Sequence, residues 1–197
     1  MSVKIIKSIK KLRIFLVGDF FLDEYLYGHV ERYSPEAPVP VVKVNKKTNN
    51  LGGAGNVLKN LVNLGCKVSI YGRIGNDTAG KVIISKVKNK KINKNFLLID
   101  KKVKTITKTR IINNNKQVVR VDDEVIQKQK KNSIKIKKKL AKELKKSSIL
   151  IISDYGKGMC TFEICKFLIS EANKNNITII VDPRKGYNDY EKYRFSN

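Results

Sequence analysis

Short apolar runs alternate along this chain with segments whose apolar residues recur three and four positions apart. The short runs have the pattern of buried strands in a parallel sheet; they cover residues 13–18, 67–71, 96–99, 148–153 and 178–181. The intervening segments have the spacing of amphipathic helices; they cover residues 53–64, 78–88, 134–146 and 161–173. This strand-helix-strand order predicts βαβ units and an α/β fold built on a mostly parallel sheet.

Two segments break the alternation. Residues 25–30 and 39–44 are β-prone and flank a Ser-Pro-Glu-Ala-Pro segment, and proline favours a sheet edge because it cannot donate a ladder hydrogen bond. Residues 105–112 and 117–121 alternate in polarity around Asn-Asn-Asn-Lys, which predicts a β-hairpin. We expect these pieces to lie at an edge or to form a small separate sheet that projects from the main one.

Polar residues follow several of the predicted strands. In an open α/β sheet, ligands bind at the carboxyl ends of the strands. Carboxylates can accept hydrogen bonds from sugar hydroxyls, and a lysine ammonium can hold a phosphate. The alternative for each aspartate is that it caps a turn or a helix. The residues at these positions are Asp19, Asp23, Asp154, Lys157, Asp182 and Lys185.

A glycine-rich segment, Gly-Gly-Ala-Gly-Asn at residues 52–56, precedes a predicted helix. We interpret it as a turn at which the backbone approaches a ligand without Cβ interference and presents free N–H groups from a helix start. The segment is neither a Gly-x-Gly-x-x-Gly fingerprint nor a P-loop with its Lys-Ser/Thr pair. Because glycine turns before helices are common, it is by itself a weak signal of binding.

The chain is strongly basic, with 42 Lys and Arg against 17 Asp and Glu and a formal net charge of +25. Such a charge suits a nucleic-acid or anionic-membrane partner. The densest run, residues 135–146, instead combines an apolar stripe with a wet lysine face and has no aromatics for stacking bases. Lys, Asn and Ile are abundant together, as A/T-rich codons would produce. We therefore expect no nucleic acid and no membrane, and keep a basic nucleic-acid-binding protein as the less favoured alternative.

Length and cysteine usage bound the class of protein. With 197 residues, 41% of them hydrophobic, the chain can bury one sizeable core, which predicts a single domain or part of one. Cys66, Cys160 and Cys165 form neither an even disulfide set nor a Cys-x-x-Cys pair, so we expect reduced thiols and no metal site. No apolar run has the roughly eighteen residues needed to span a bilayer. These features predict a soluble, cytoplasmic protein.

Seven motifs in a fixed order resemble the ribokinase-like (PfkB) carbohydrate kinases. They are Val-Gly-Asp-Phe-Phe-Leu-Asp at 17–23, Ser-Pro-Glu-Ala-Pro-Val-Pro at 34–40, Gly-Gly-Ala-Gly-Asn at 52–56, Thr-Ile-Thr-Lys-Thr-Arg at 105–110, Val-Arg-Val-Asp at 119–122, Ser-Asp-Tyr-Gly-Lys-Gly at 153–158 and Val-Asp-Pro-Arg at 181–184. The resemblance runs from residue 13 to the end of the chain. The second and sixth motifs are most similar to the branch that phosphorylates heptose 7-phosphate.

This resemblance implies a Rossmann-like body, with helices on both faces of a mostly parallel sheet, and a small β-sheet lid that closes over the sugar and often dimerises. The lid strands would fall at residues 24–45 and 104–122 of a domain that occupies residues 1–197. By resemblance, the groups that bind the sugar are Asp19, Asp23, Gly52, Gly53, Asn56 and Asp154. Those that hold its phosphate are Arg110, Arg120 and Lys157, for which the alternative is a solvated charge. Asp182 and Lys185 would contact the nucleotide.

The implied reaction is phosphoryl transfer from ATP, with Mg²⁺, to C1 of heptose 7-phosphate, on the way to ADP-heptose and the lipopolysaccharide core. The base in this family is the aspartate of a Gly-Ala-Gly-Asp motif at a helix start, and a base that takes the hydroxyl proton is part of such chemistry. The motif is absent from the 197 residues, because Gly53, Ala54 and Gly55 are followed by Asn56. We therefore expect a truncated N-terminal part of such a kinase, with the C-terminal part missing, no catalytic residue in this chain and no activity alone.

The expected partners are a small sugar phosphate, a second copy bound through the lid, and a separately encoded C-terminal part. The alternative in another class of protein is a non-catalytic sugar-phosphate-binding protein or a decayed remnant of a kinase.

Overall fold

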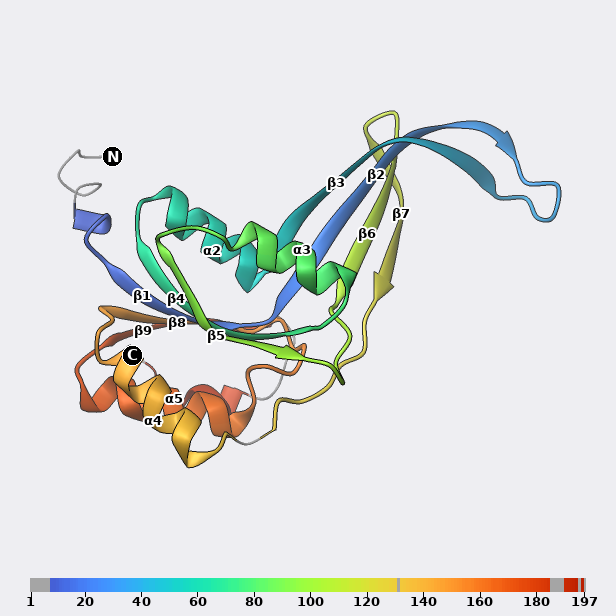
Figure 1. The fold of residues 1–197 in the computed structure, drawn as a ribbon. Coiled ribbons are helices and arrows are strands. Elements are labelled where there is room, and N and C mark those ends of the chain that lie inside the picture. The colour runs from blue at the N-terminus through green and yellow to red at the C-terminus, as the bar shows by residue number, and fades with distance from the viewer. Residues whose placement is uncertain (1–7, 131, 185–189, 195, 197) are drawn as a thin grey trace.

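A five-stranded parallel sheet forms the body of the protein, seen here in a computed structural model that describes residues 8–130, 132–184, 190–194 and 196 (Figure 1). Its strands lie in the order β5-β4-β1-β8-β9, and all four neighbouring pairs are parallel. Their bounds are β1 Arg13–Gly18, β4 Lys67–Gly75, β5 Ile92–Asp100, β8 Ile149–Ser153 and β9 Thr178–Asp182. The expected α/β fold is confirmed, and each predicted strand of the body is present.

Helices cover both faces of this sheet (Figure 1). One face carries α2 (Ala54–Asn63) and α3 (Thr78–Lys86), and the other carries α4 (Ile134–Leu144) and α5 (Phe162–Lys174). Successive side chains of a strand point to opposite faces, so Leu16 of β1 packs in the core with α2 and α3, while Phe15 packs in the core with α4 and α5. Each side chain buried in this way contributes roughly 2 kcal/mol. A short 3₁₀ turn, η1 (Tyr190–Tyr193), packs against α5.

The helices begin where polar side chains accept hydrogen bonds from free amides of the first turn. Asp77 accepts from the Gly80 amide at 2.8 Å, Ser133 from the Ile136 amide and Thr161 from the Ile164 amide, the last two at 3.4 Å. These are the usual capping residues. The start of α2 differs, since Gly53 occupies the cap position and supplies no side chain.

A second sheet rises away from the body as a long ribbon (Figure 1). Its order is β3-β2-β6-β7, with bounds β2 Phe20–Tyr33, β3 Pro40–Gly53, β6 Thr107–Asn113 and β7 Lys116–Asp123. The small separate sheet is therefore confirmed, and β6 and β7 form the expected hairpin. Asn114 and Asn115 make its tight turn at φ values of 47° and 64°.

The sequence underestimated β2 and β3, which were predicted only as residues 25–30 and 39–44. Each strand has 14 residues, and β2 begins two residues after β1 ends. The two strands pair from Phe20 with Gly53 to Tyr33 with Pro40, with two register shifts between these ends, so each holds the other extended over most of its length. Both strands belong to the expected separate sheet, in which β3, with Pro40, lies at the edge and β2 lies between β3 and β6.

Within the ranges described, no helix combines the length and apolar character required to cross a membrane.

Candidate functional site

The chain adds strands first on one side of β1 and then on the other, and this reversal indicates where a ligand can bind to the body. From β1 the chain adds β4 and β5 on one side of the sheet, and later adds β8 and β9 on the other. Such a reversal leaves a crevice at the carboxyl ends of the central strands. Asp19 follows β1 and Asp154 follows β8, so both lie at this edge. Their surroundings show which of them can face a ligand.

Asp19 is buried beneath the loop that follows β8. Its side chain accepts backbone hydrogen bonds from Tyr155 and Lys157 at 3.0 Å and from Met159 at 2.9 Å. Burial raises the pKa of Asp19, and the amide hydrogen bonds oppose that shift. The carboxylate therefore shapes residues 155–159 from below, which is the turn-stabilising alternative considered from the sequence. Direct contact of Asp19 with a sugar stays a prediction.

Asp154 is also occupied by groups of this chain. One carboxylate oxygen accepts the Gly156 amide at 2.7 Å, and the other contacts the Lys192 ammonium and the Tyr193 hydroxyl, each at 2.5 Å. Burial and the bond to Asp154 raise the pKa of Tyr193. This buried trio joins η1 to the end of β8. A substrate could reach the Asp154 carboxylate only by displacing these partners, so its predicted role in binding is not supported by the geometry.

Asp23 differs from Asp19 and Asp154, because part of its side chain remains exposed on the second sheet. Asp23 of β2 and Arg110 of β6 form an ion pair of 2.6 Å, with 16% and 21% of their side chains exposed. The Arg110 guanidinium also lies over the Tyr25 ring, 5.3 Å from its centre. The hydrogen bond that Arg110 donates to the Asp23 carboxylate raises the pKa of Arg110. The carboxylate is thus oriented by Arg110 and remains partly accessible.

The glycine segment is a strand end rather than a turn, which corrects the expectation for residues 52–56. Gly52 and Gly53 are the last residues of β3, and α2 begins at the next residue. At Gly53, which has φ 58°, the backbone changes directly from strand to helix. The Ala54 amide donates to the Asp19 carbonyl at 2.9 Å. No loop forms because β3 stays paired with β2 as far as Gly53.

Gly52 is needed at this position because other groups approach its Cα closely. A Cβ there would overlap the Phe21 ring and an oxygen of the Asp23 carboxylate. The predicted sugar-binding glycine therefore lies directly beside Asp23. Asn56, predicted for the same role, is exposed in the first turn of α2.

A chain of ion pairs connects the second sheet to the loop after β8. Arg120 and Lys108 both contact Asp122, at 2.8 and 2.6 Å; Lys108 and Lys157 both contact Glu124, at 3.2 and 2.7 Å. The predicted phosphate candidates Arg120 and Lys157 thus belong to one network, and Arg110 lies next to Lys108 on the same face of β6. Lys108, Asp122 and Glu124, which were not among the residues predicted for the site, complete this network.

One signal in the sequence could have found Lys108. Alternate residues of a strand share a face, so Lys108 had to accompany Arg110 in the Thr-Lys-Thr-Arg segment. The pairing of Asp23 with Lys108 across β2 and β6 could not be read from the sequence, because it depends on the register between two strands far apart in the chain.

Tyr155 extends the site to the end of β9. Its ring packs edge-on against Phe21, with centres 5.5 Å apart. Burial raises the pKa of Tyr155, and the nearby carboxylates of Asp182 and Asp23 add to the shift. Asp182, predicted to contact nucleotide, is exposed at the end of β9, and its carbonyl accepts the Asp154 amide. Lys185, the other predicted nucleotide contact, lies outside the described residues.

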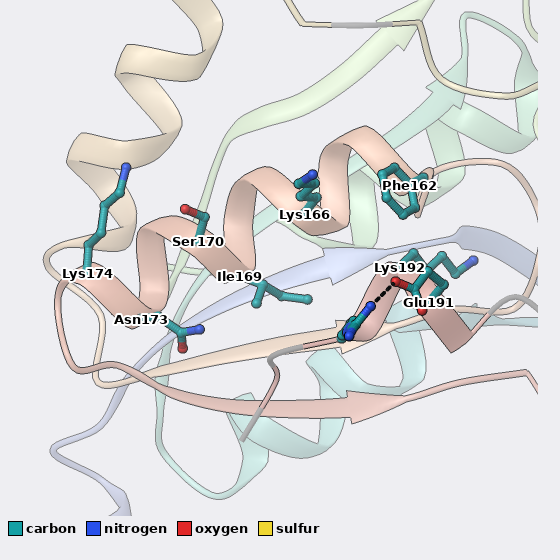
Figure 2. Close-up of a pocket in the computed structure, with 9 residues that line it drawn as sticks. Phe162, Lys166, Ile169, Ser170, Asn173, Lys174, Glu191 and Lys192 are labelled. Carbon is teal, nitrogen blue, oxygen red and sulfur yellow. Dashed lines mark hydrogen bonds and ion pairs between the residues drawn. The ribbon is translucent and has the colours of Figure 1, made fainter.

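A hollow of about 540 Å³ lies elsewhere, between α5 and η1. Figure 2 shows Phe162, Lys166 and Ile169 of α5 on one side and Glu191 and Lys192 on the other. It contains none of the site residues named from the sequence. A large volume by itself does not identify a functional site.

Comparison with known proteins decides the family. The sequence profile of the pfkB family carbohydrate kinases matches residues 14–193. The chain belongs to this family. The match spans both sheets, so the site described above lies within the family's domain.

Family members with curated names cover most of this chain, whereas the chain covers a minor part of each. The bifunctional protein HldE of Sulfurimonas denitrificans is 43% identical over 169 residues, which are 85% of this chain and 35% of that protein. HldE of Campylobacter curvus is 40% identical over 185 residues, which are 94% of this chain and 39% of that protein. The chain thus spans somewhat over a third of the length of these relatives.

Solved pfkB-type structures share the fold at low sequence identity. Arabidopsis thaliana ribokinase, complexed with ribose and ATP, superimposes with a TM-score of 0.66 at 13% identity, covering 87% of this chain and 53% of that one. A carbohydrate kinase from Agrobacterium tumefaciens gives a TM-score of 0.64 at 15% identity, covering 86% and 53%. These likenesses establish the ribokinase-like fold of the chain.

The fit of the nucleotide and metal can be tested on the donor groups. Among the described residues, no group of three or more His, Cys, Asp or Glu side chains is arranged to hold a metal ion. Asp154 is saturated by Lys192, Tyr193 and Gly156, so at this edge Asp182 is the more accessible carboxylate. Mg²⁺ with a nucleotide needs only one or two carboxylates beside water and the phosphates, so Asp182 is the residue at this edge that would take part in holding them, and we derive no step through that group.

Proposed function

We propose that this chain is the N-terminal, sugar-binding part of an ATP-dependent kinase that phosphorylates heptose 7-phosphate at C1 during ADP-heptose synthesis for the lipopolysaccharide core. Membership of the pfkB family and 40–45% identity to several HldE proteins support this proposal. The observation that carries it is the gathering of Asp23, Arg110 and Lys157 around one face of the second sheet.

In this proposal Asp23 accepts hydrogen bonds from sugar hydroxyls, and Arg110 holds the carboxylate in place. A carboxylate can accept several hydrogen bonds, and the 2.6 Å pair with Arg110 leaves its other oxygen, which lies beside Gly52, for a ligand. The Phe21 and Tyr155 rings, in edge-on contact, form an apolar wall next to it. Positioning of this kind is a main contribution of the protein to phosphoryl transfer.

ATP, with Mg²⁺, would supply the transferred phosphoryl group when bound by a complete domain. The base implied by the family resemblance is the aspartate of a Gly-Ala-Gly-Asp motif, which the 197 residues do not contain. Accordingly we propose that this chain alone binds the sugar phosphate without transferring a phosphoryl group to it. Mixing the chain with heptose 7-phosphate, ATP and Mg²⁺ should give no ADP above background.

Calorimetry with heptose 7-phosphate tests the binding proposal. We expect the wild-type chain to bind this ligand and Asp23→Ala to lose binding. The matched control is Glu24→Ala, which removes the neighbouring carboxylate on the opposite face of β2, where it pairs with Lys47 at 3.0 Å. Unchanged affinity in Asp23→Ala, or equal loss in both variants, would refute the assignment.

We also propose that two copies associate through the face of the second sheet opposite the site. Val119 and Val121 alternate with Arg120 along β7, so they point away from it, and they are 44% and 52% exposed. Exposed apolar residues clustered on a sheet favour association. Sedimentation should show a dimer, and Val119→Lys with Val121→Lys should give a monomer. A wild-type monomer at all concentrations would contradict this.

A further inference from the structure

Two lysines from different parts of the fold converge on Glu124. Lys108 belongs to β6 of the second sheet, whereas Lys157 belongs to the loop after β8 of the body. Their ammonium nitrogens lie 3.2 and 2.7 Å from the two oxygens of the Glu124 carboxylate. Both lysine side chains are 12% exposed and Glu124 is 23% exposed. A single carboxylate therefore holds two nearly buried cations.

Contacts other than Glu124 hold the side chain of Lys108 and the backbone of Lys157. Lys108 contacts Asp122 at 2.6 Å and lies over the Phe21 ring, 5.6 Å from its centre. The Lys157 amide donates to Asp19. If a ligand anion took the place of Glu124, it would meet an ammonium group that Asp122 and Phe21 already hold and a second one on a loop whose backbone is fixed. This is a pre-formed anion site that a carboxylate of the chain now fills.

The register places this site next to the proposed sugar position. Asp23 pairs with Lys108 across β2 and β6, and paired residues share a face of the sheet. A sugar hydroxyl bound at Asp23 therefore lies within the length of a sugar phosphate from both lysines. An uncharged hydroxyl at this end of a sugar would gain little binding energy from two ammonium groups. A phosphate monoester suits them, since it carries a charge near −2 and three acceptor oxygens.

Glu124 is the carboxylate of the network that can move at the lowest cost. Asp122 belongs to β7, where Lys108 pairs with it in the strand ladder. Glu124 follows Asp123, the last residue of β7, so its backbone is outside the ladder. Burial opposes the charged form of Glu124, but hydrogen bonds from Lys157 and Lys108 outweigh it and lower its pKa. Glu124 is therefore a charged group on an irregular segment, held mainly by the two cations.

We propose that Lys108 and Lys157 form the subsite for the phosphate group of the substrate, and that Glu124 is an internal counter-anion which the phosphate displaces. This inference rests on the proposed function, because it assumes a sugar phosphate bound at Asp23. Glu124 weakens binding of the phosphate by competing for the same two cations. An uncharged sugar has no anionic group to displace Glu124 from them, so Glu124 selects for phosphorylated sugars. Displacement of Glu124 also replaces a direct link between the second sheet and the body with a link through the ligand.

Calorimetry on the whole chain tests this with three ligands: heptose 7-phosphate, unphosphorylated heptose and inorganic phosphate. Glu124→Gln keeps the shape and removes the charge. It should tighten binding of heptose 7-phosphate and of inorganic phosphate by roughly 3- to 10-fold, as expected for removal of one nearby like charge. Lys108→Gln and Lys157→Gln should each weaken binding of both ligands by roughly 10-fold or more.

Glu24→Gln is the matched control, because it also removes a carboxylate from a lysine pair, on the opposite face of β2. Its affinities should equal those of the wild type. Glu124→Ala provides a second test and should also tighten phosphate binding. Unchanged or weaker phosphate binding in both Glu124 variants, with heptose 7-phosphate still bound by the wild type and lost in Asp23→Ala, would overturn this inference alone. Absence of heptose 7-phosphate binding in the wild type would overturn the proposed function and the inference with it.

Discussion

The Asp77 carboxylate joins the start of α3 to the segment that enters the second sheet, by accepting the Thr105 amide at 2.7 Å. Its other oxygen accepts the Gly80 amide at 2.8 Å, and the Thr105 hydroxyl accepts the Gly75 amide at 2.8 Å. Thr105 is 2% exposed and lies two residues before β6. The position of Lys108 and Arg110 relative to the body therefore depends on these buried hydrogen bonds around Asp77 and Thr105.

Replacement of Asp77 by Ala should destabilise the protein by about 1–3 kcal/mol, because the α3 cap and the Thr105 partner are lost together. Urea unfolding measures the change. Asp100→Ala is the control, since Asp100 accepts a local amide, that of Lys102, in an exposed turn, and it should cost less than about 0.5 kcal/mol. Equal effects of the two substitutions would show that the link to Thr105 contributes nothing.

The same residue predicts a pH dependence with a definite sign. Burial opposes ionisation of Asp77, but hydrogen bonds from Thr105 and Gly80 outweigh it and lower its pKa. A carboxyl with a lowered pKa in the folded state stabilises the fold above its unfolded value, and this stabilisation is lost as the pH falls through the folded pKa. Between about pH 4 and pH 2 the free energy of unfolding should fall less steeply in Asp77→Asn than in the wild type. Parallel curves would contradict this assignment.

Gly80→Ala should destabilise the protein although alanine is the better helix former. A Cβ at Gly80 would overlap the Gly75 carbonyl oxygen and approach the Thr105 hydroxyl at 3.0 Å. Overpacking against backbone costs about 1–3 kcal/mol, more than the roughly 1 kcal/mol that alanine contributes in a helix. Thermal unfolding should show a lower midpoint than the wild type. The control Lys81→Ala, exposed on the same helix, should leave the midpoint unchanged or slightly raised.

Asp23 and Arg110 should be energetically coupled in the free protein. Their 2.6 Å contact is less than a quarter exposed on either side, so solvent screens it only in part. A double-mutant cycle with Asp23→Asn and Arg110→Gln, followed by urea unfolding, should give a coupling free energy of about 1–2 kcal/mol. Additive single effects would mean that the pair does not orient the carboxylate.

A substitution in the hairpin turn between β6 and β7 should increase the stability of the protein. Asn115 has φ 64°, a conformation that glycine adopts without strain and that two-residue hairpins favour at this position. Asn115→Gly should stabilise the protein by at most about 1 kcal/mol, because the relief of the left-handed conformation is partly offset by the greater backbone entropy of glycine in the unfolded chain. Asn49→Gly, in the interior of β3, is the control and should destabilise by a similar amount. A loss of stability in Asn115→Gly would show that the turn geometry is wrong.

Local patterns in the sequence were sufficient for much of this fold. The apolar runs predicted the strands of the body because a buried parallel strand needs apolar residues on both faces. The helical spacing of Leu140 and Leu144 predicted α4 despite its many lysines, and both leucines are fully buried. The length of β2 and β3 was missed, because Lys46, Lys47 and Asn49 are poor strand residues that pairing with β2 holds extended.

The roles of individual site residues were harder to predict from the sequence. An aspartate after a strand looks the same in sequence whether it faces a ligand or its own loop. Asp19 and Asp154 bind groups of the chain, while Asp23 remains partly open. These differences arise from the path of residues 154–159 and from the buried Lys192, and neither the path nor the contact follows from the local pattern of residues.

By itself the sequence determined the alternation of strands and helices, the hairpin and a set of motifs, since these depend on side-chain periodicity and on order along the chain. The tertiary structure alone decided which charges meet. Glu124 contacts Lys157, 33 residues away, and Asp23 contacts Arg110, 87 residues away. Such pairings are set by strand register and by the docking of two sheets. Electrostatic energy depends on distance in space rather than on separation in sequence.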